Sequence, residues 1–336
     1  MADYKNIKGF NIQYLDSDPP NPIEGQMWFN STTQTLKGAE VGGVTAGTWA
    51  SGGNLNTGRV GAGGAGGSNS DGLCFGGTPA APRAITESYN GTSWTEVADL
   101  NLGRNSGAGI GVSSTAALYV SGLIPPITTP PTATKTETEQ WNGTSWTEIA
   151  DVNLGRWRLR GCGVTTAAIV MGGGNPWPLG GSEIANTELY NGTSWTEVND
   201  LNQVKRQVFA FGTSTAALSA GGYNGTVGQT SNTELWDGTS WTEVNNLNTA
   251  RSAGAASGVQ TLGIINAGEP APITATEYWN GTSWTEVNDS VVGYSNVANS
   301  QLSSTSALKF SGEPGTQQAT EEWTVPEYVV KTFTTS

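Results

Sequence analysis

A five-residue turn motif recurs along the chain and constrains its fold more than any other feature. The motif is Asn-Gly-Thr-Ser-Trp, with Asp in place of Asn in one copy, and it returns every 43 to 52 residues. A period of this length is typical of propellers and solenoids, in which each repeat is one supersecondary unit. Asn-Gly and Asp-Gly supply the positive φ angles of a type I′ turn, so each copy predicts two strands joined by a tight hairpin. The copies are residues 90–94, 142–146, 191–195, 237–241 and 280–284.

Two further elements accompany the turn. A Thr-Glu-x-aromatic sequence precedes every copy, and a sixth one stands at 320–323. Further upstream, a short apolar run ends in glycine, and a segment of small residues precedes it. Small residues suit the crowded innermost strand around a propeller axis. Each repeat therefore predicts four strands, and the repeats together predict six blades. The apolar runs are 73–77, 116–122, 167–173, 216–222, 262–268 and 306–312.

The two ends of the repeat region complete each other. Trp49 stands ten residues before Arg59, as Trp94 stands before Arg104, so Trp49 marks an outer strand without inner partners. The last repeat, about 294–323, has inner strands but no turn motif. Joining these segments closes the ring and removes both open sheet edges. In the competing closure, residues 324–336 supply the missing strand; otherwise they form a C-terminal strand or tail.

The Gly-ended second strand, the aromatic residue before the turn, the Trp after it and the later Arg resemble the kelch repeat over residues 46–323. Ser121-Gly122, Ala267-Gly268 and Ser311-Gly312 stand where kelch proteins usually show a Gly-Gly pair. The resemblance implies an all-β fold, a six-bladed kelch-type β-propeller. The outer-strand tryptophans are then structural residues packed between blades: Trp49, Trp94, Trp146, Trp195, Trp241 and Trp284.

Residues 1–45 do not share the repeat and predict a short β-hairpin or extended adaptor. Pro22, Gly25, Trp28 and Asn30 match a Pro-x-x-Gly-x-x-Trp-x-Asn pattern that resembles segments of phage tail-fibre proteins. With the repeats, the chain resembles kelch-like virion structural proteins of marine bacteriophages. This resemblance implies that residues 1–45 bind other virion proteins, that each particle carries several copies, and that the protein resides in virions assembled in the host cytoplasm.

Composition excludes several classes of function. The chain has no histidine, which removes His-based acid–base chemistry and the commonest zinc and copper ligand sets. We therefore expect no catalytic residue, no metal and no cofactor. A net charge of −13 without a run of Lys and Arg argues against nucleic acid, and no apolar stretch is long enough for membrane insertion. Cys74 and Cys162 lie in apolar, Gly-flanked runs and are expected to be buried thiols.

A few aromatic and basic residues stand outside the repeat pattern. Trp157 lies beside Arg158 and Arg160, and Trp177 lies in a Pro-flanked loop of the same repeat. These four residues are candidate ligand-binding residues, for example for carbohydrate stacking, with local packing as the alternative. In a propeller, the variable loops and the connections between blades share one face, opposite the uniform Asn-Gly turns. Such a face suits a binding platform, with drift in unconstrained loops as the alternative.

These features favour a non-enzymatic bacteriophage virion protein, either a fibre or a capsid or tail decoration. It would present the propeller for adhesion to a host-surface glycan or protein. One alternative is a glycan-active enzyme, which requires an asymmetric carboxylate cluster near the propeller axis. Another is a purely structural protein that stabilises the particle. Glutamates that recur in every repeat, such as Glu87, are expected to hold the blades together.

Overall fold

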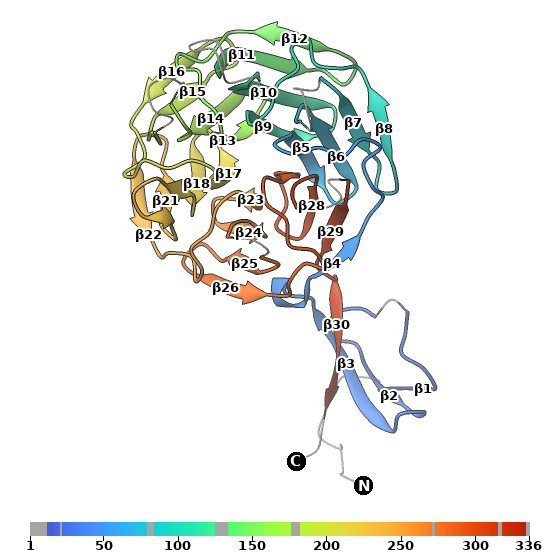
Figure 1. The fold of residues 1–336 in the computed structure, drawn as a ribbon. Helices are drawn as coiled ribbons and strands as arrows, with labels where there is room; N and C mark the ends of the chain where they lie inside the picture. Colours follow the sequence, from blue (N-terminus) through green and yellow to red (C-terminus); the bar gives the residue numbers. More distant parts are fainter. Residues whose placement is uncertain are drawn as a thin grey trace. The chain divides into compact units, whose positions relative to one another are not determined.

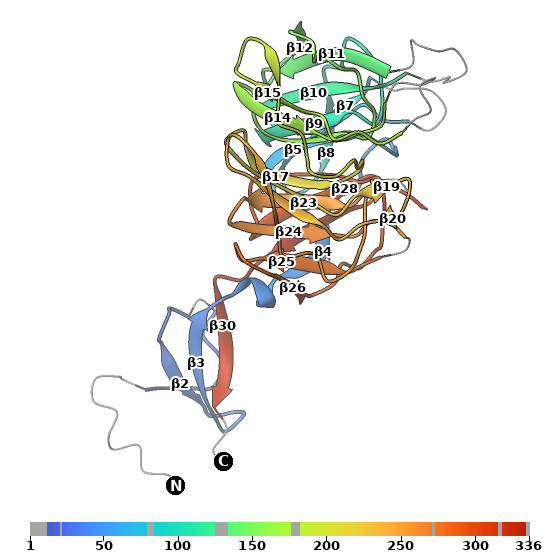
Figure 2. The same ribbon diagram turned by 90° about the vertical axis from the view of Figure 1, so that its left-hand side faces the viewer.

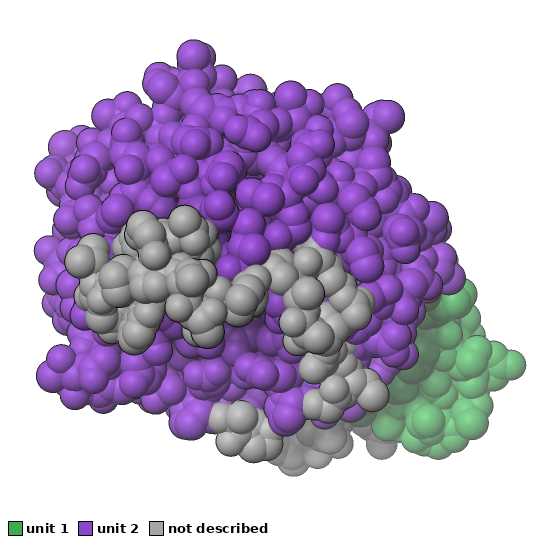
Figure 3. All heavy atoms as spheres, turned by 45° about the horizontal axis from the view of Figure 1, so that its top comes forward, with its two compact units in different colours: residues 1–47, 325–336 green, residues 48–324 purple. Residues whose placement is uncertain are grey.

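The computed structural model describes residues 12–20, 22–78, 84–124, 134–175, 182–270, 273–314 and 318–333. The chain divides into two compact units, coloured separately in Figure 3. One unit comprises Thr48–Thr324, and the other comprises Met1–Gly47 together with Val325–Ser336.

The larger unit is a six-bladed β-propeller. Its described residues form six four-stranded antiparallel sheets arranged around a common axis (Figure 1). In blades one to five the chain runs outward from the innermost strand, and the predicted Asn-Gly or Asp-Gly turns join the third and fourth strands. The strands of blades one to five are β5 (Gly63–Ser68), β6 (Asp71–Phe75), β7 (Thr86–Tyr89), β8 (Trp94–Val97); β9 (Ala108–Ser113), β10 (Ala116–Leu123), β11 (Thr134–Trp141), β12 (Trp146–Ile149); β13 (Arg160–Val164), β14 (Ala167–Met171), β15 (Thr187–Tyr190), β16 (Trp195–Val198); β17 (Phe209–Thr213), β18 (Ala216–Ala220), β21 (Thr233–Trp236), β22 (Trp241–Val244); and β23 (Ala255–Val259), β24 (Leu262–Asn266), β25 (Thr276–Trp279), β26 (Trp284–Val287).

The sixth blade joins the two ends of the repeat region. Its strands are β27 (Ala298–Asn299), β28 (Ser306–Phe310), β29 (Thr320–Thr324) and β4 (Thr48–Ser51). Trp323 of β29 lies opposite Trp49 of β4, with ring centroids 5.5 Å apart. The closure through 324–336 is not the one the chain adopts. The C-terminal strand β30 (Tyr328–Phe333) pairs with β3 of the smaller unit instead.

Tryptophans of the outer strands link each blade to the one before it. The indole N–H of Trp146 in blade two donates to the Thr86 hydroxyl in blade one at 3.0 Å. The same bond joins Trp94 to Thr320, Trp241 to Thr187, Trp284 to Thr233 and Trp49 to Thr276. Trp195 is as buried as the others, but its indole nitrogen has no hydrogen-bond partner within the described residues. The threonine and the tryptophan of the repeat thus hold neighbouring blades together.

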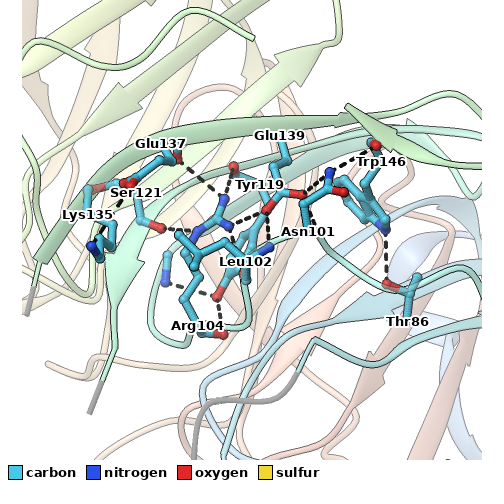
Figure 4. A network of polar contacts seen from close by, with 11 residues as sticks. Thr86, Asn101, Leu102, Arg104, Tyr119, Ser121, Lys135, Glu137, Glu139 and Trp146 are labelled. Carbon is cyan, nitrogen blue, oxygen red and sulfur yellow. Dashed lines mark hydrogen bonds and ion pairs between the residues drawn. The ribbon is translucent and has the colours of Figure 1, made fainter. Parts of the chain in front are cut away.

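A buried ion pair stands in every blade. In blade two, Arg104 Nη1 donates to Glu139 at 2.5 Å, and its other nitrogens donate to backbone carbonyls, among them Ser121 and Tyr119 (Figure 4). Glu139 also accepts from the backbone N–H of Asn101, which lies in the connection from blade one. The recurring glutamate therefore fastens each connection to the next blade, as expected. The pairs are Arg59–Glu87, Arg104–Glu139, Arg156–Glu188, Lys205–Glu234, Arg251–Glu277 and Lys309–Glu321.

The cores of the blades are apolar, and both cysteines belong to them. Cys74 and Cys162 are free thiols with no exposed surface, as the sequence indicates. Burial raises the pKa of Cys74 to about 11 and raises the pKa of Cys162 still further. Neither sulfur is therefore a nucleophile at neutral pH.

The smaller unit is a single four-stranded sheet. Its strand order is β1 (Gln13–Leu15), β2 (Met27–Asn30), β3 (Thr35–Val41) and β30, and a 3-10 turn η1 (Val44–Ala46) follows β3. Strands β2 and β3 form the hairpin that the sequence predicts, whereas β1 lies parallel to β2. The described residues include no helix long and apolar enough to cross a membrane.

Candidate ligand-binding site at the propeller axis

Six equivalent residues, one in each blade, form a ring around the propeller axis. All six have φ between 52° and 66° and stand two residues after the position of the buried arginine in the repeat. Backbone hydrogen bonds of 2.7 to 3.3 Å join five of the six neighbouring pairs, for example from Arg158 N–H to the Ser106 carbonyl; none is present between the described residues Asn296 and Ala253. Because every residue precedes an innermost strand, the ring encircles the axis. The residues are Gly61, Ser106, Arg158, Gln207, Ala253 and Asn296.

Outside this ring lies a rim of bridged residues, whose backbone pairing recurs in every blade while the side chains vary. In each blade a residue of the connection forms a β-bridge with a residue at the end of the second strand or three positions after it. This is the face that also carries the loops between second and third strands, including the short hairpin β19 (Tyr223–Asn224) and β20 (Gly228–Gln229), seen at the right edge of Figure 2. The bridged pairs are Val60 with Thr78, Asn105 with Leu123, Trp157 with Gly174, Arg206 with Tyr223, Ser252 with Glu269, and Ser295 with Glu313. A symmetric scaffold therefore presents an asymmetric set of side chains.

Blades three and four contribute aromatic rings and cations. The Arg158 guanidinium lies 4.8 Å from the Trp157 ring centroid, and that of Arg206 lies 5.2 Å from the same ring. Arg206 also lies 4.4 Å from the Tyr223 ring and pairs with Glu183. Stacking of guanidinium groups on aromatic faces fixes the cations in place. A hollow of about 470 Å³ opens beside Glu183, Arg206 and Tyr223.

Arg160, the first residue of β13, extends the positive charge inward from the ring. Burial, and then the charge of Arg158, lowers the pKa of Arg160 to about 10. Its guanidinium makes one hydrogen bond, 3.5 Å long, to the Leu159 carbonyl, and no carboxylate of the described residues pairs with it. Arg158 and Arg160 therefore flank Leu159 in the sequence, with no direct carboxylate partner among the described residues. They lie at the end of the axis that carries the ring and the rim, which we call the axial mouth.

Blades five and six contribute carboxylates, and two amides connect them to the arginines. Arg158 Nη1 donates to Gln207 Oε1 at 3.3 Å, and Gln207 Nε2 donates to Asn296 Oδ1 at 2.5 Å. Asn296 Nδ2 in turn donates to Glu313 at 2.6 Å and to Glu269 at 3.4 Å. A second hollow of about 470 Å³ is lined by both glutamates together with Gln229 and Ser295 and two prolines. A polar chain thus crosses the mouth from cations to carboxylates.

Below the mouth, Gln301 closes the axis. Its side chain accepts from Gly111 N–H at 3.1 Å and donates to the Gly109 and Gly161 carbonyls at 2.7 and 3.3 Å. Its backbone bonds to Gly66 and Gly258 at 3.0 Å each. One residue of blade six therefore contacts blades one, two, three and five.

Sequence reasoning identified part of this site. Trp157, Arg158 and Arg160 come together at the mouth, whereas Trp177 lies outside the described residues. The site residues that sequence reasoning missed are Arg206, Gln207, Tyr223, Glu269, Asn296 and Glu313. A usable signal existed for them, because each occupies a repeat-equivalent position where the residue type varies between blades.

In the smaller unit, the residues of the proposed attachment motif surround Asp18. Trp28 and Asn30 donate to one Asp18 oxygen at 3.0 and 2.8 Å, and Lys37 donates to the other at 2.6 Å. The hydrogen bond from Lys37, followed by those from Asn30 and Trp28, lowers the pKa of Asp18 to about 2. The motif thus has a folding role.

The two other motif residues lie in the turn before β2. Gly25 adopts a φ of 76° and donates its N–H to the Ala39 carbonyl at 2.9 Å, and Pro22 is half-buried nearby.

The described residues contain no group of three or more Cys, Asp or Glu side chains placed to hold a metal ion. The closed ring of six blades and its asymmetric mouth define the larger unit as a six-bladed β-propeller with a candidate binding site on its axis.

Comparison with known proteins supports the β-propeller fold. The chain is similar to a solved structure described as "Structure of YjhT", with a TM-score of 0.64 and 12% sequence identity, over 83% of this chain and 99% of that chain. At this identity the likeness shows the fold alone. No family model matches the chain, and no curated protein matches it.

Proposed function

We propose that the chain is a non-enzymatic bacteriophage virion protein whose propeller adheres to the host surface through the axial mouth. The observation that carries this proposal is the stacked cluster of Trp157, Arg158, Arg206 and Tyr223. Aromatic faces and fixed guanidinium groups are the side chains that saccharides and other polar surface ligands stack on and hydrogen-bond to. The cluster occurs in two blades only, so the repeat itself does not require it.

The two-unit organisation supports the same proposal. The smaller unit, with Pro22, Gly25, Trp28 and Asn30, is the segment that would bind other virion proteins. Several copies on one particle multiply weak contacts through effective concentration, so each propeller needs only a shallow site. The two hollows at the mouth are shallow sites of this kind.

Binding of fluorescently labelled full-length protein to candidate host bacteria tests the proposal. We expect saturable binding that falls at least about tenfold in the Trp157→Ala variant, since aromatic anchors dominate such interfaces. Thr144→Ala, in an exposed Asn-Gly turn on the opposite face, is the matched control and should bind as the parent does. Absence of binding to every host tested would overturn adhesion and favour a particle-stabilising role.

One observation favours a second candidate, a glycan-active enzyme. Glu269 and Glu313 share the amide nitrogen of Asn296 and line the same hollow. Paired carboxylates flanking a cleft are the machinery of most glycoside hydrolases. This function predicts new reducing ends when the protein is incubated with host polysaccharide. Their release should cease in both Glu269→Gln and Glu313→Gln.

A further inference from the structure

The charges at the axial mouth are arranged unlike those elsewhere in the propeller. In the six buried ion pairs of the blades, the cation contacts its carboxylate directly at 2.5 to 3.0 Å. At the mouth, Arg158 contacts neither Glu269 nor Glu313. The side chains of Gln207 and Asn296 stand between them and hold the opposite charges apart.

The two ends of this polar chain interact electrostatically without being paired. Burial and the charge of Arg206 lower the pKa of Arg158, while Glu269 and Glu313 act in the opposite direction. Opposite charges this close would gain energy by direct contact in a partly buried site. The amides stand between the charges, and both Gln207 and Asn296 are buried and held by the hydrogen bond that joins them.

Toward the residues that the structure describes, both ends retain unused hydrogen-bonding capacity. A guanidinium has five N–H donors, and among these residues Arg158 uses one of them on Gln207, while Arg160 uses one on a backbone carbonyl. Glu269 receives a hydrogen bond of 3.4 Å from Asn296, which leaves lone pairs on its carboxylate for another donor. All four charged side chains are half-buried, so a ligand can reach them.

We propose that the mouth binds a zwitterionic ligand group, with its anionic end on Arg158 and Arg160 and its ammonium end on Glu269 and Glu313. An anion alone would leave the carboxylates unsatisfied, and a cation alone would leave the arginines unsatisfied. A zwitterionic group satisfies both, which makes an aminoalkyl phosphate or an amino acid substituent of a surface glycan the matching chemistry. The inference rests on the proposed function, whose ligand it specifies.

Calorimetric titration of the full-length chain with small probes tests this assignment. O-phosphoethanolamine carries both charges, whereas inorganic phosphate and ethanolamine carry one each, and β-alanine replaces the phosphate by a carboxylate. We expect O-phosphoethanolamine to bind at least about tenfold more tightly than either single-charge probe, since each charge-assisted contact contributes separately. The ratio between O-phosphoethanolamine and β-alanine then identifies the anionic group.

Variants that each remove one charge localise the two ends of the bound ligand group. Arg158→Gln should reduce the affinity for O-phosphoethanolamine at least about tenfold and leave that for ethanolamine unchanged. Glu313→Gln keeps the acceptor for Asn296 but removes the charge, and it should show the reverse pattern with phosphate. Glu148→Gln, exposed on β12, and Lys331→Gln, exposed on β30, are matched controls. Unchanged melting temperatures show that the variants are folded.

Equal affinities for O-phosphoethanolamine and phosphate, or variants that bind as the parent does, overturn the zwitterion assignment. The outcome is separable from that of the cell-binding experiment. Cell adhesion without zwitterion binding refutes this inference and leaves the proposed function standing. Zwitterion binding without adhesion to any host refutes the proposed function and leaves the assignment of a zwitterionic ligand standing.

Discussion

Lys309 and Tyr294 have exchanged roles in the sixth blade, because Lys309 supplies the buried cation that the other five blades carry at the position of Tyr294. The residue four positions before the innermost strand is Arg or Lys in blades one to five and Tyr294 in blade six. Lys309 instead extends from β28, where Ile265 stands in blade five, and contacts Glu321 at 2.6 Å. Its ammonium also donates to the Val292 carbonyl at 2.8 Å and lies 5.8 Å from the Tyr294 ring. The buried ion pair is thus kept in space although its sequence position has moved.

This exchange predicts a compensating pair of substitutions. Lys309→Ile alone removes one partner of a buried ion pair and should destabilise the propeller by about 3–5 kcal/mol, because the Glu321 charge is left without compensation. Adding Tyr294→Arg restores the pattern of the other blades and should recover much of this loss. Urea unfolding of the parent, both single variants and the double variant measures the coupling. A double variant no more stable than Lys309→Ile would show that the two positions are not equivalent in space.

The same exchange shows which features of the fold could be predicted from the sequence and which could not. The six Thr-Glu-x-aromatic copies predict six blades, and the ten-residue spacing from Trp to Arg predicts the role of Trp49, because hairpin turns and strand lengths repeat along the chain. The spacing fails at Tyr294, since a carboxylate requires a cation within contact distance and not at one position in the chain. Gln301 shows the same limit. Nothing in the sequence indicates that one residue, two positions after the short strand β27, would bond to four other blades.

The residues of the candidate site divide in a similar way. Trp157 and Arg158 stand out in the sequence because they interrupt a repeat of small residues. Glu269 and Glu313 follow a Gly-ended strand in different blades, and only the closure of the ring brings them to the same amide of Asn296. Long-range convergence of this kind depends on blade number and register, which local patterns do not contain.

Ring closure through β4 predicts which terminus stabilises the propeller. Trp49 is buried and donates to Thr276 at 3.0 Å, so Trp49→Ala should destabilise the larger unit by about 3–5 kcal/mol. Truncation after Thr324 leaves every strand of blade six in place and should leave the propeller transition unchanged. Differential scanning calorimetry of the two variants gives the comparison. Greater loss from the truncation than from Trp49→Ala would contradict this closure.

The hydrogen bonds of Gln301 at the propeller axis predict a local effect on amide hydrogen exchange. Gln301→Ala removes the acceptor for the Gly111 N–H and the donors for the Gly109 and Gly161 carbonyls. Leaving such buried groups unsatisfied costs about 1–3 kcal/mol each, less where water enters the space. Hydrogen exchange at Gly111 should therefore accelerate, while Gly258, which bonds to the residue's backbone, changes less. Uniform acceleration in all blades would instead indicate loss of global stability.

Asp18 predicts a pH dependence confined to the smaller unit. Its pKa is about 2 in the folded chain because Lys37, Asn30 and Trp28 donate to the carboxylate, against a value near 3.9 in an unfolded chain. Between these values the unfolded state binds more protons, so the stabilisation is complete above about pH 4 and is lost as the pH falls towards 2. The indole N–H resonance of Trp28 reports the contact directly. We expect it to shift across that window in the parent chain. In Asp18→Asn the resonance should be insensitive to pH there, because the residue no longer titrates. A Trp28 resonance that titrates equally in both chains would assign the transition to another carboxyl group.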